Sequence, residues 1–113
     1  MKTLHLNLKK EWFDLILSGE KKEEYRELTK YWESKLFDLG SKTGISFLHE
    51  DIMLPKKYDT ITFSNGYSKT RRQIIVKYNG LDVGLGSKKW GAETNKPYYV
   101  LKLGEILETK NIK

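Results

Sequence analysis

Residues 4–27, LHLNLKKEWFDLILSGEKKEEYRE, carry the patterns that decide the fold. Residues 4–8 alternate strictly between leucine and a polar residue, which predicts a strand with its three leucines on one buried face. From Trp12 onward the apolar residues recur at helical spacing, with Asn7 in place to cap the helix and Gly19 suited to the left-handed position that ends it. The stretch therefore predicts a strand followed at once by an amphipathic helix.

The run that follows this helix is highly charged and yet regularly spaced. A solvated charge run is expected to lack fixed spacing, whereas Lys21, Glu24 and Arg26 follow Gly19 at steps of two, five and seven. A regular strand would place Lys21 and Glu24 on opposite faces. If both serve one site, a bulge or a turn must lie between them.

Written as G-x-K-x-x-E-x-R, this pattern resembles the signature of the ASCH domain, a small PUA-like β-barrel. The resemblance is to the small single-domain type of bacteria or phages. It covers the opening strand and helix, the motif, the strand and loop over 61–67, and a closing strand over 98–105. It implies an α+β fold: one domain over residues 1–113, built as a PUA-like β-barrel of about six strands with two flanking helices near the N-terminus.

The middle of the chain predicts a second helix and a long loop. Thr29 is placed to cap a helix in which Trp32, Leu36 and Leu39 form the inward stripe, and Gly40 marks its end. Residues 40–57 mix polar residues with a short apolar patch, which predicts a loop that carries a short helix or acts as a lid.

The second half of the chain is expected to be all β. Two Asn-Gly pairs follow alternating runs, and this dipeptide is a strong hairpin signal because both residues tolerate positive φ. Asn79-Gly80 is flanked by strand patterns and predicts a tight hairpin, whereas Asn65-Gly66 predicts a wider loop. A last strand is expected over 98–103, after which residues 108–113 trail off.

Size and composition exclude several classes of protein. A chain of 113 residues fits one compact domain. There is no cysteine for a disulfide or a thiolate site, and His5 and His49 lack the spacing of metal ligands, so no metal is expected. The absence of P-loop and dinucleotide motifs leaves no cofactor to expect. Without an apolar run of the roughly 20 residues that span a bilayer, or an apolar signal region, a cytoplasmic protein with no membrane contact is predicted.

Positive charge is concentrated in the second half. The net charge is +6; residues 1–56 hold ten basic and ten acidic residues, whereas residues 57–113 hold eleven against five. A one-sided basic face can bind polyanions by displacing phosphate counterions. Charge alone fits simple solubility equally well.

The motif, the charge and the aromatic residues together predict a cleft that binds RNA, or a nucleotide or nucleoside, with no obligate protein partner. The residues expected to line it are Lys21, Glu24, Arg26, Asn65, Tyr67, Arg72, Lys88 and Trp90.

Each of these residues has an expected role. Lys21 would bind phosphate, and Arg26 would make bidentate hydrogen bonds to phosphate or carboxylate. Glu24 would either accept a hydrogen bond from a base N–H or only orient Lys21. Asn65 would read a base edge and Tyr67 would stack on a base.

The remaining three residues of the predicted cleft are Arg72, Lys88 and Trp90. Arg71 and Arg72 are adjacent and would point to opposite faces of a strand, so at most one of them faces the site, and Arg72 is preferred. Lys88 and Trp90 would contact the backbone of single-stranded nucleic acid, although Trp90 is equally suited to close the end of a barrel.

An enzyme is the alternative interpretation. Some small ASCH proteins are amidohydrolases that remove an acetyl group from a modified cytidine, with the motif lysine, a threonine three residues later and a separate glutamate. Here Lys21 matches the lysine, but Glu24 stands at the threonine position. Lys21 and Glu24 would be the catalytic residues in that case, with Glu93 as a candidate for the remote carboxylate.

Overall fold

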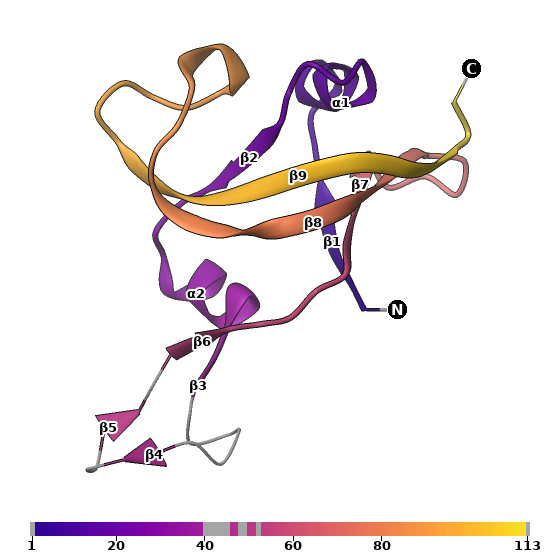
Figure 1. Cartoon of the computed structure of the whole chain (residues 1–113). Coiled ribbons are helices and arrows are strands. Elements are labelled where there is room, and N and C mark those ends of the chain that lie inside the picture. Colours follow the sequence, from indigo (N-terminus) through magenta and orange to yellow (C-terminus); the bar gives the residue numbers. More distant parts are fainter. Residues whose placement is uncertain (1, 40–45, 48–49, 52, 113) are drawn as a thin grey trace.

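The computed structural model describes residues 2–39, 46–47, 50–51 and 53–112. Its main element is a curled mixed sheet of five strands in the order β1-β7-β8-β9-β2, in which β1 is parallel to β7 and the other neighbours are antiparallel (Figure 1). The strands are β1 (Thr3–Asn7), β7 (Thr60–Asn65), β8 (Arg72–Leu85), β9 (Pro97–Lys110) and β2 (Glu23–Arg26). β1 and β2 are the two edges of this sheet, so the curl makes a half-barrel. With its helices, this is the α+β architecture that the sequence predicts.

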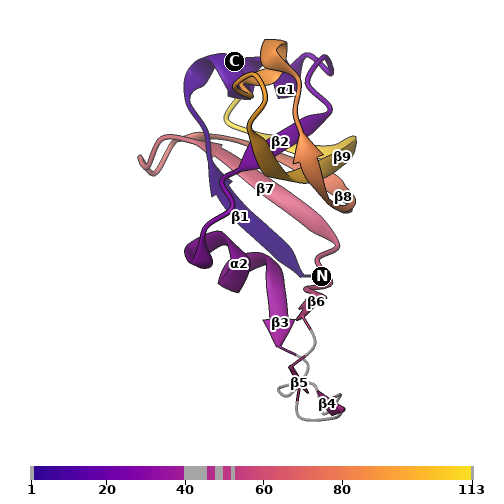
Figure 2. The same cartoon turned by 90° about the vertical axis from the view of Figure 1, so that its left-hand side faces the viewer.

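Two helices lie on either side of the long β8–β9 ribbon. They are α1 (Lys10–Leu17) and α2 (Lys30–Leu36), and a single 3₁₀ turn, η2 (Lys88–Trp90), lies between β8 and β9. In both cartoon views α1 lies at the top of the molecule and α2 lies lower, and Figure 2 shows the η2 segment beside α1. This places the end of α1, the motif and the η2 segment in one region.

The hydrophobic core fills the concave side of the curled sheet and the inner faces of the helices. The three leucines of residues 4–8 are buried as predicted, and Phe13 of α1 is fully inaccessible to solvent. The other core residues are Ile16, Leu36, Ile61, Phe63, Ile74, Val76, Tyr99, Leu101 and Leu103. Burial of such side chains contributes about 1.5–3 kcal/mol each, which explains why α1 is anchored although its first turn lacks a side-chain cap.

The prediction for the start of α1 is wrong and the prediction for its end is confirmed. The residue before the helix is Lys9, and the Asn7 side chain instead donates a hydrogen bond to the carbonyl of Gly66 (2.8 Å). Asn7 lies too early for the cap because it is the last residue of β1. Gly19 has the predicted positive φ of 84° just beyond the helix.

The second helix begins as predicted but ends early. The Thr29 hydroxyl accepts a hydrogen bond from the Trp32 backbone N–H (3.3 Å). The helix stops at Leu36, and Phe37–Leu39 forms β3, which pairs with β6 (Met53–Pro55). Leu39 therefore belongs to a strand, because pairing with β6 satisfies the backbone that another helical turn would have used.

Residues 40–57 are more regular than a loop where the structure describes them. Besides β6, the short strands β4 (Ser46–Phe47) and β5 (Glu50–Asp51) pair with each other. Gly40, and with it the predicted helix stop, lies outside the described residues. So does part of the segment for which a short helix or a lid is predicted.

The tight hairpin predicted at Asn79-Gly80 is wrong. Strand β8 continues through both residues, and its register against β9 shifts between Tyr78 and Leu81. The positive φ of Gly80 (116°) accommodates this bulge. Leu81–Leu85 pairs with Pro97–Leu101 instead of folding back on the first half of β8, so the chain reverses through residues 86–96.

The last strand is longer than predicted, while the loop after Asn65-Gly66 is confirmed. β9 continues to Lys110 because Glu108–Lys110 pairs with Gln73–Ile75 at the start of β8. The chain therefore does not trail off at residue 108. β7 ends at Asn65 and β8 begins at Arg72, which leaves a wide connection between them.

Candidate nucleic-acid interface

Lys21 is a buried lysine with a full set of acceptors. Its side chain is 0% exposed and its ammonium donates to the backbone carbonyls of Glu23 and Trp90, both at 2.7 Å. The third partner is Glu24 Oε1, at 3.2 Å. Lys21 lies in the irregular segment between the turn after α1 and β2, and from there its ammonium reaches the Glu24 carboxylate.

The surroundings of Lys21 act on its charge in opposite directions. Burial lowers the pKa of the Lys21 ammonium below its usual value, while the nearby Glu24 carboxylate raises it. The rings of Tyr25 and Trp12 lie 4.9 Å and 5.7 Å from the ammonium. These rings, together with the carboxylate and the two carbonyls, favour the charged form that burial disfavours.

Glu24 links Lys21 to Arg26. Its second oxygen, Oε2, lies 2.6 Å from Arg26 Nη2, and the same Nη2 donates to the backbone carbonyl of Asn7 (3.3 Å). The guanidinium also stacks over the Trp32 ring, 4.8 Å from its centroid. Arg26 Nε is buried and has no hydrogen-bond partner among the described residues. Arg26 is thus held in place by one edge of its guanidinium while a further donor stays unsatisfied.

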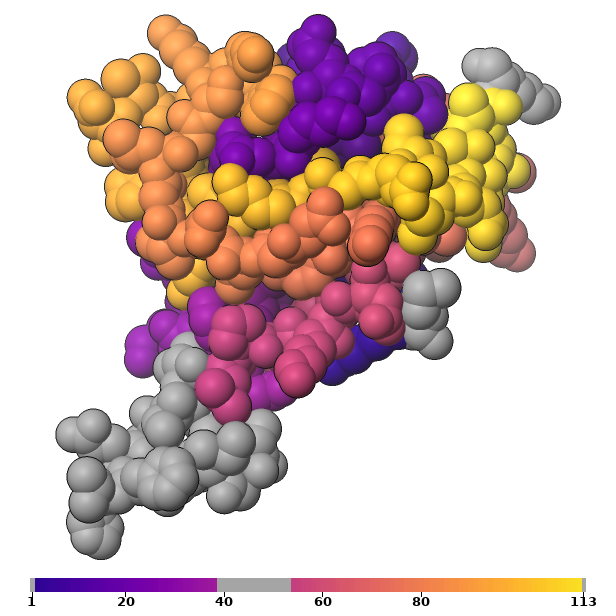
Figure 3. All heavy atoms as spheres, in the orientation of Figure 1, coloured from indigo at the N-terminus to yellow at the C-terminus, as the bar shows by residue number. Residues whose placement is uncertain are grey.

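The η2 segment packs tightly against β2 and α1. A Cβ at Gly86 would lie 2.6 Å from the Tyr25 ring, and one at Gly91 would lie 3.2 Å from Trp12. The Tyr25 hydroxyl accepts a hydrogen bond from the Ser87 backbone N–H and donates to Glu23, both at 2.8 Å. Burial raises the pKa of Tyr25 to about 12. These contacts fix the position of Trp90, and Figure 3 shows the segment against α1 on the surface.

A pocket of about 250 Å³ opens beside the motif, and we call it the motif pocket. Its lining residues are Asn7, Leu8, Lys9, Trp12, Glu24, Tyr25, Arg26, Trp90, Gly91 and Tyr98. Trp90 Nε1 resembles Arg26 Nε in being buried without a hydrogen-bond partner in the described part of the chain. The lining therefore includes four aromatic side chains, the cation of Lys9, and two residues, Arg26 and Trp90, that each carry a buried N–H without a partner in the described part of the chain.

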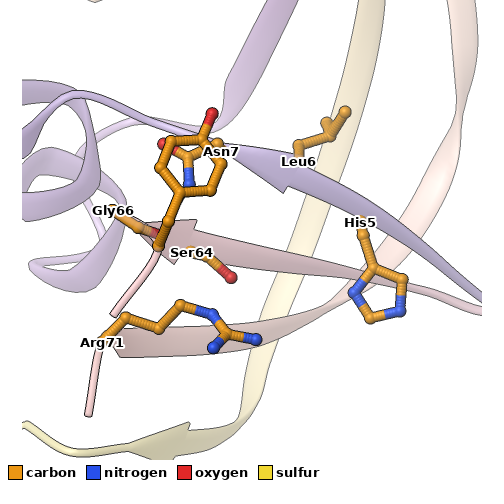
Figure 4. A pocket seen from close by; sticks show the side chains of 7 residues that line it. His5, Leu6, Asn7, Ser64, Gly66 and Arg71 are labelled. Atoms are coloured by element: carbon orange, nitrogen blue, oxygen red, sulfur yellow. The ribbon is translucent and has the colours of Figure 1, made fainter. Parts of the chain in front are cut away.

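A second pocket, of about 460 Å³, lies beside the loop after β7, and we call it the loop pocket (Figure 4). Its lining residues are His5, Leu6, Asn7, Ser64, Gly66, Tyr67 and Arg71. Asn7 lines both pockets.

The structure brings four of the predicted site residues together. Lys21, Glu24 and Arg26 form one chain of contacts, and Trp90 joins it through its carbonyl. Lys88 lies exposed two residues before Trp90 in the same turn.

The other three predicted residues lie away from the motif pocket. Tyr67 lines the loop pocket. The Asn65 amide donates to the Leu8 carbonyl (3.1 Å) and accepts from Arg72 (3.0 Å). Arg72 also pairs with Asp14 (2.9 Å), so Asn65 and Arg72 tie the sheet to α1.

Arg71 rather than Arg72 lines the loop pocket. The expectation that the two arginines point to opposite faces of one strand does not apply here, since β8 begins only at Arg72. Glu93, the candidate remote carboxylate, is exposed, pairs with Lys96 (3.1 Å) and lines neither of these two pockets.

Sequence reasoning missed several lining residues. Trp12 begins the helical apolar pattern, yet it is half-buried at the motif pocket, whereas its neighbour Phe13 is fully buried. Adjacent residues on a helix point about 100° apart, so Trp12 and Phe13 do not share one direction, which is the signal that could have separated them. Lys9 and Tyr98 carry no such signal, because they reach the pocket only through the packing of α1 and β9.

Comparison with known protein families, with curated proteins and with solved structures finds no match for this chain. No helix in the described part of the chain is long and apolar enough to cross a bilayer. Among the described residues, no three histidine or acidic side chains converge as metal ligands.

Proposed function

We propose that the protein is an ASCH-type, PUA-like domain of the cytoplasm that binds single-stranded RNA, or a nucleotide within it, in the motif pocket. The observation that carries this proposal is the pairing of aromatic walls with unsatisfied donors. Trp12, Trp90 and Tyr98 line the pocket, and Arg26 and Trp90 each hold a buried N–H without a partner in the described structure.

The size and chemistry of the motif pocket favour one nucleobase. At about 250 Å³ it is smaller than the roughly 300–1,000 Å³ of sites for drug-sized ligands. Aromatic side chains bind bases of any sequence by stacking, and the guanidinium N–H groups suit the ring nitrogens and carbonyls of a base edge. Lys9 adds a cation that suits the phosphate attached to that base.

The hydrolase alternative requires Lys21 as a general base, and its contacts favour another role. Its three ammonium hydrogens have three acceptors, namely two carbonyls and the Glu24 carboxylate. A general base needs a free lone pair directed at the substrate. We therefore favour Lys21 as the residue that holds Trp90 and Glu24 in place, and binding rather than catalysis as the function.

Fluorescence anisotropy with a labelled single-stranded RNA, over a series of salt concentrations, tests the binding proposal. The Lys9→Ala variant is expected to weaken binding to all sequences about equally and to reduce the salt slope by about one. The Trp90→Ala variant, which removes a stacking face worth about 1–3 kcal/mol, is expected to lower affinity about 5-fold or more. An absence of binding at low salt would contradict the proposal.

A charge-matched control is available on β8. Lys77 is exposed and lines neither the motif pocket nor the loop pocket, so Lys77→Ala removes the same charge as Lys9→Ala and should change affinity little. Equal losses from the two variants would show that charge alone, and not the pocket, accounts for binding. Release of cytidine from acetylated cytidine, in proportion to the concentration of the wild-type protein, would instead support the hydrolase.

A further inference from the structure

We infer that the loop pocket holds a second nucleotide, next to the one in the motif pocket, so that the ligand is an oligonucleotide rather than a free mononucleotide. This inference rests on the proposed function of the motif pocket.

The two pockets are neighbours that share a wall. Asn7 lines both, its backbone carbonyl accepts from Arg26 of the motif pocket, and its side-chain amide donates to Gly66 of the loop pocket. A ligand that passes from one pocket to the other therefore crosses a single residue at the end of β1. Neighbouring pockets of this kind suit two consecutive nucleotides of one strand.

Tyr67 is placed as a stacking face. Its side chain lines the loop pocket and is 88% exposed, the highest exposure of any large hydrophobic residue in the described structure. An aromatic ring this exposed contributes little to packing, whereas an unstacked base gains about 1–3 kcal/mol from such a ring.

Arg71 supplies the charge that this second position needs. Its Nη1 donates to the Ser68 carbonyl (3.1 Å), and no ion pair with a described residue involves it. Arg72 beside it is already paired with Asp14. Figure 4 shows Arg71 and His5 reaching in from two sides of the loop pocket, with Ser64 between them. The Arg71 guanidinium suits the phosphate of one nucleotide, and the exposed Tyr67 ring suits its base.

The inference is tested by the length dependence of binding. Isothermal titration calorimetry with uridine monophosphate and with uridine oligonucleotides of two to four residues compares the two pockets directly. We expect the oligonucleotides to bind at least 10-fold more tightly than the monophosphate. Tyr67→Ala and Arg71→Ala should each lower oligonucleotide affinity about 5-fold or more, and by a larger factor than they lower monophosphate affinity, whereas Trp90→Ala should weaken both ligands.

Matched controls separate the loop pocket from general effects. Tyr31 is also an exposed tyrosine, at 60%, on α2 and outside both pockets, so Tyr31→Ala should leave both affinities unchanged. Lys77→Ala serves in the same way for Arg71→Ala. Equal affinity for the monophosphate and the oligonucleotides would contradict nucleotide binding in the loop pocket, but it would be consistent with nucleotide binding in the motif pocket. Failure of both ligands to bind would overturn the proposed function and this inference together.

Discussion

The Lys21 ammonium donates a 2.7 Å hydrogen bond to the backbone carbonyl of Trp90, which lies 69 residues further along the chain. This bond fastens the η2 segment to the start of β2 from beneath the motif pocket. The lysine of the signature motif therefore positions the tryptophan that forms a wall of the site.

Replacing Lys21 with methionine is expected to destabilise the protein strongly. The variant keeps the apolar stem but leaves Glu24 buried without one of its two cationic partners. Breaking a buried pair in this way costs about 3–5 kcal/mol. Urea unfolding followed by tryptophan fluorescence measures the loss. Lys22→Met, one residue away at an exposed position, should be nearly neutral, and similar losses for the two variants would disprove the special role of Lys21.

A methyl group at residue 86 should disturb the motif pocket, whereas the same group at residue 84 should not. The Cβ of Gly86→Ala would lie 2.6 Å from the Tyr25 ring and 2.7 Å from Ala92 Cβ, while that of Gly84→Ala meets nothing within 4 Å. Overpacking of this kind costs about 1–3 kcal/mol. Thermal unfolding of the two variants provides the comparison, and a stable Gly86→Ala protein would show that the η2 segment packs more loosely than described.

The Tyr25 hydroxyl should make stability depend on alkaline pH. Burial raises its folded-state pKa to about 12 from an unfolded value of 10.0, so the folded state holds this proton more tightly. The resulting stabilisation is fully present below pH 10 and is lost as pH rises toward 12. Urea unfolding of the wild type and of Tyr25→Phe at several pH values tests this. We expect the advantage of the wild type to shrink between pH 10 and 12, and a constant difference would contradict the assignment.

Loss of the Thr29 cap should weaken α2. The Thr29 hydroxyl accepts from the Trp32 N–H, and removing such a cap costs about 1 kcal/mol. Thr29→Ala should therefore lower the free energy of unfolding by this amount, and Thr29→Ser should retain most of it. Chemical denaturation distinguishes the two variants; a serine variant as unstable as the alanine variant would indicate that the methyl group, not the hydroxyl, stabilises the helix.

Local patterns predicted the elements whose signals lie within a few residues. The leucines of residues 4–8, the Gly19 helix end and the Thr29 cap depend on backbone geometry over one or two turns, and the structure has all three. Lys21 and Glu24, in contrast, meet although their spacing in a regular strand would place them on opposite faces, because Lys21 lies in the irregular segment before β2.

Partners distant in the chain decided what local patterns could not. Asn79-Gly80 has the residues of a hairpin, yet pairing of Leu81–Leu85 with the start of β9 keeps β8 extended. In the same way, pairing with β6 ends α2 at Leu36. A strand takes the partner that satisfies most of its backbone hydrogen bonds, and that partner is not visible in a local window.

By itself, the sequence determined the α+β class and the opening strand and helix. Only the tertiary structure placed Trp90 over the motif and Trp12 at the pocket, and gave the loop pocket Arg71 in place of Arg72. The physical reason is that short-range spacing fixes side-chain direction along one element. A pocket wall, in contrast, forms from side chains of several elements, and their approach depends on how the β8–β9 ribbon curls and where the η2 segment packs.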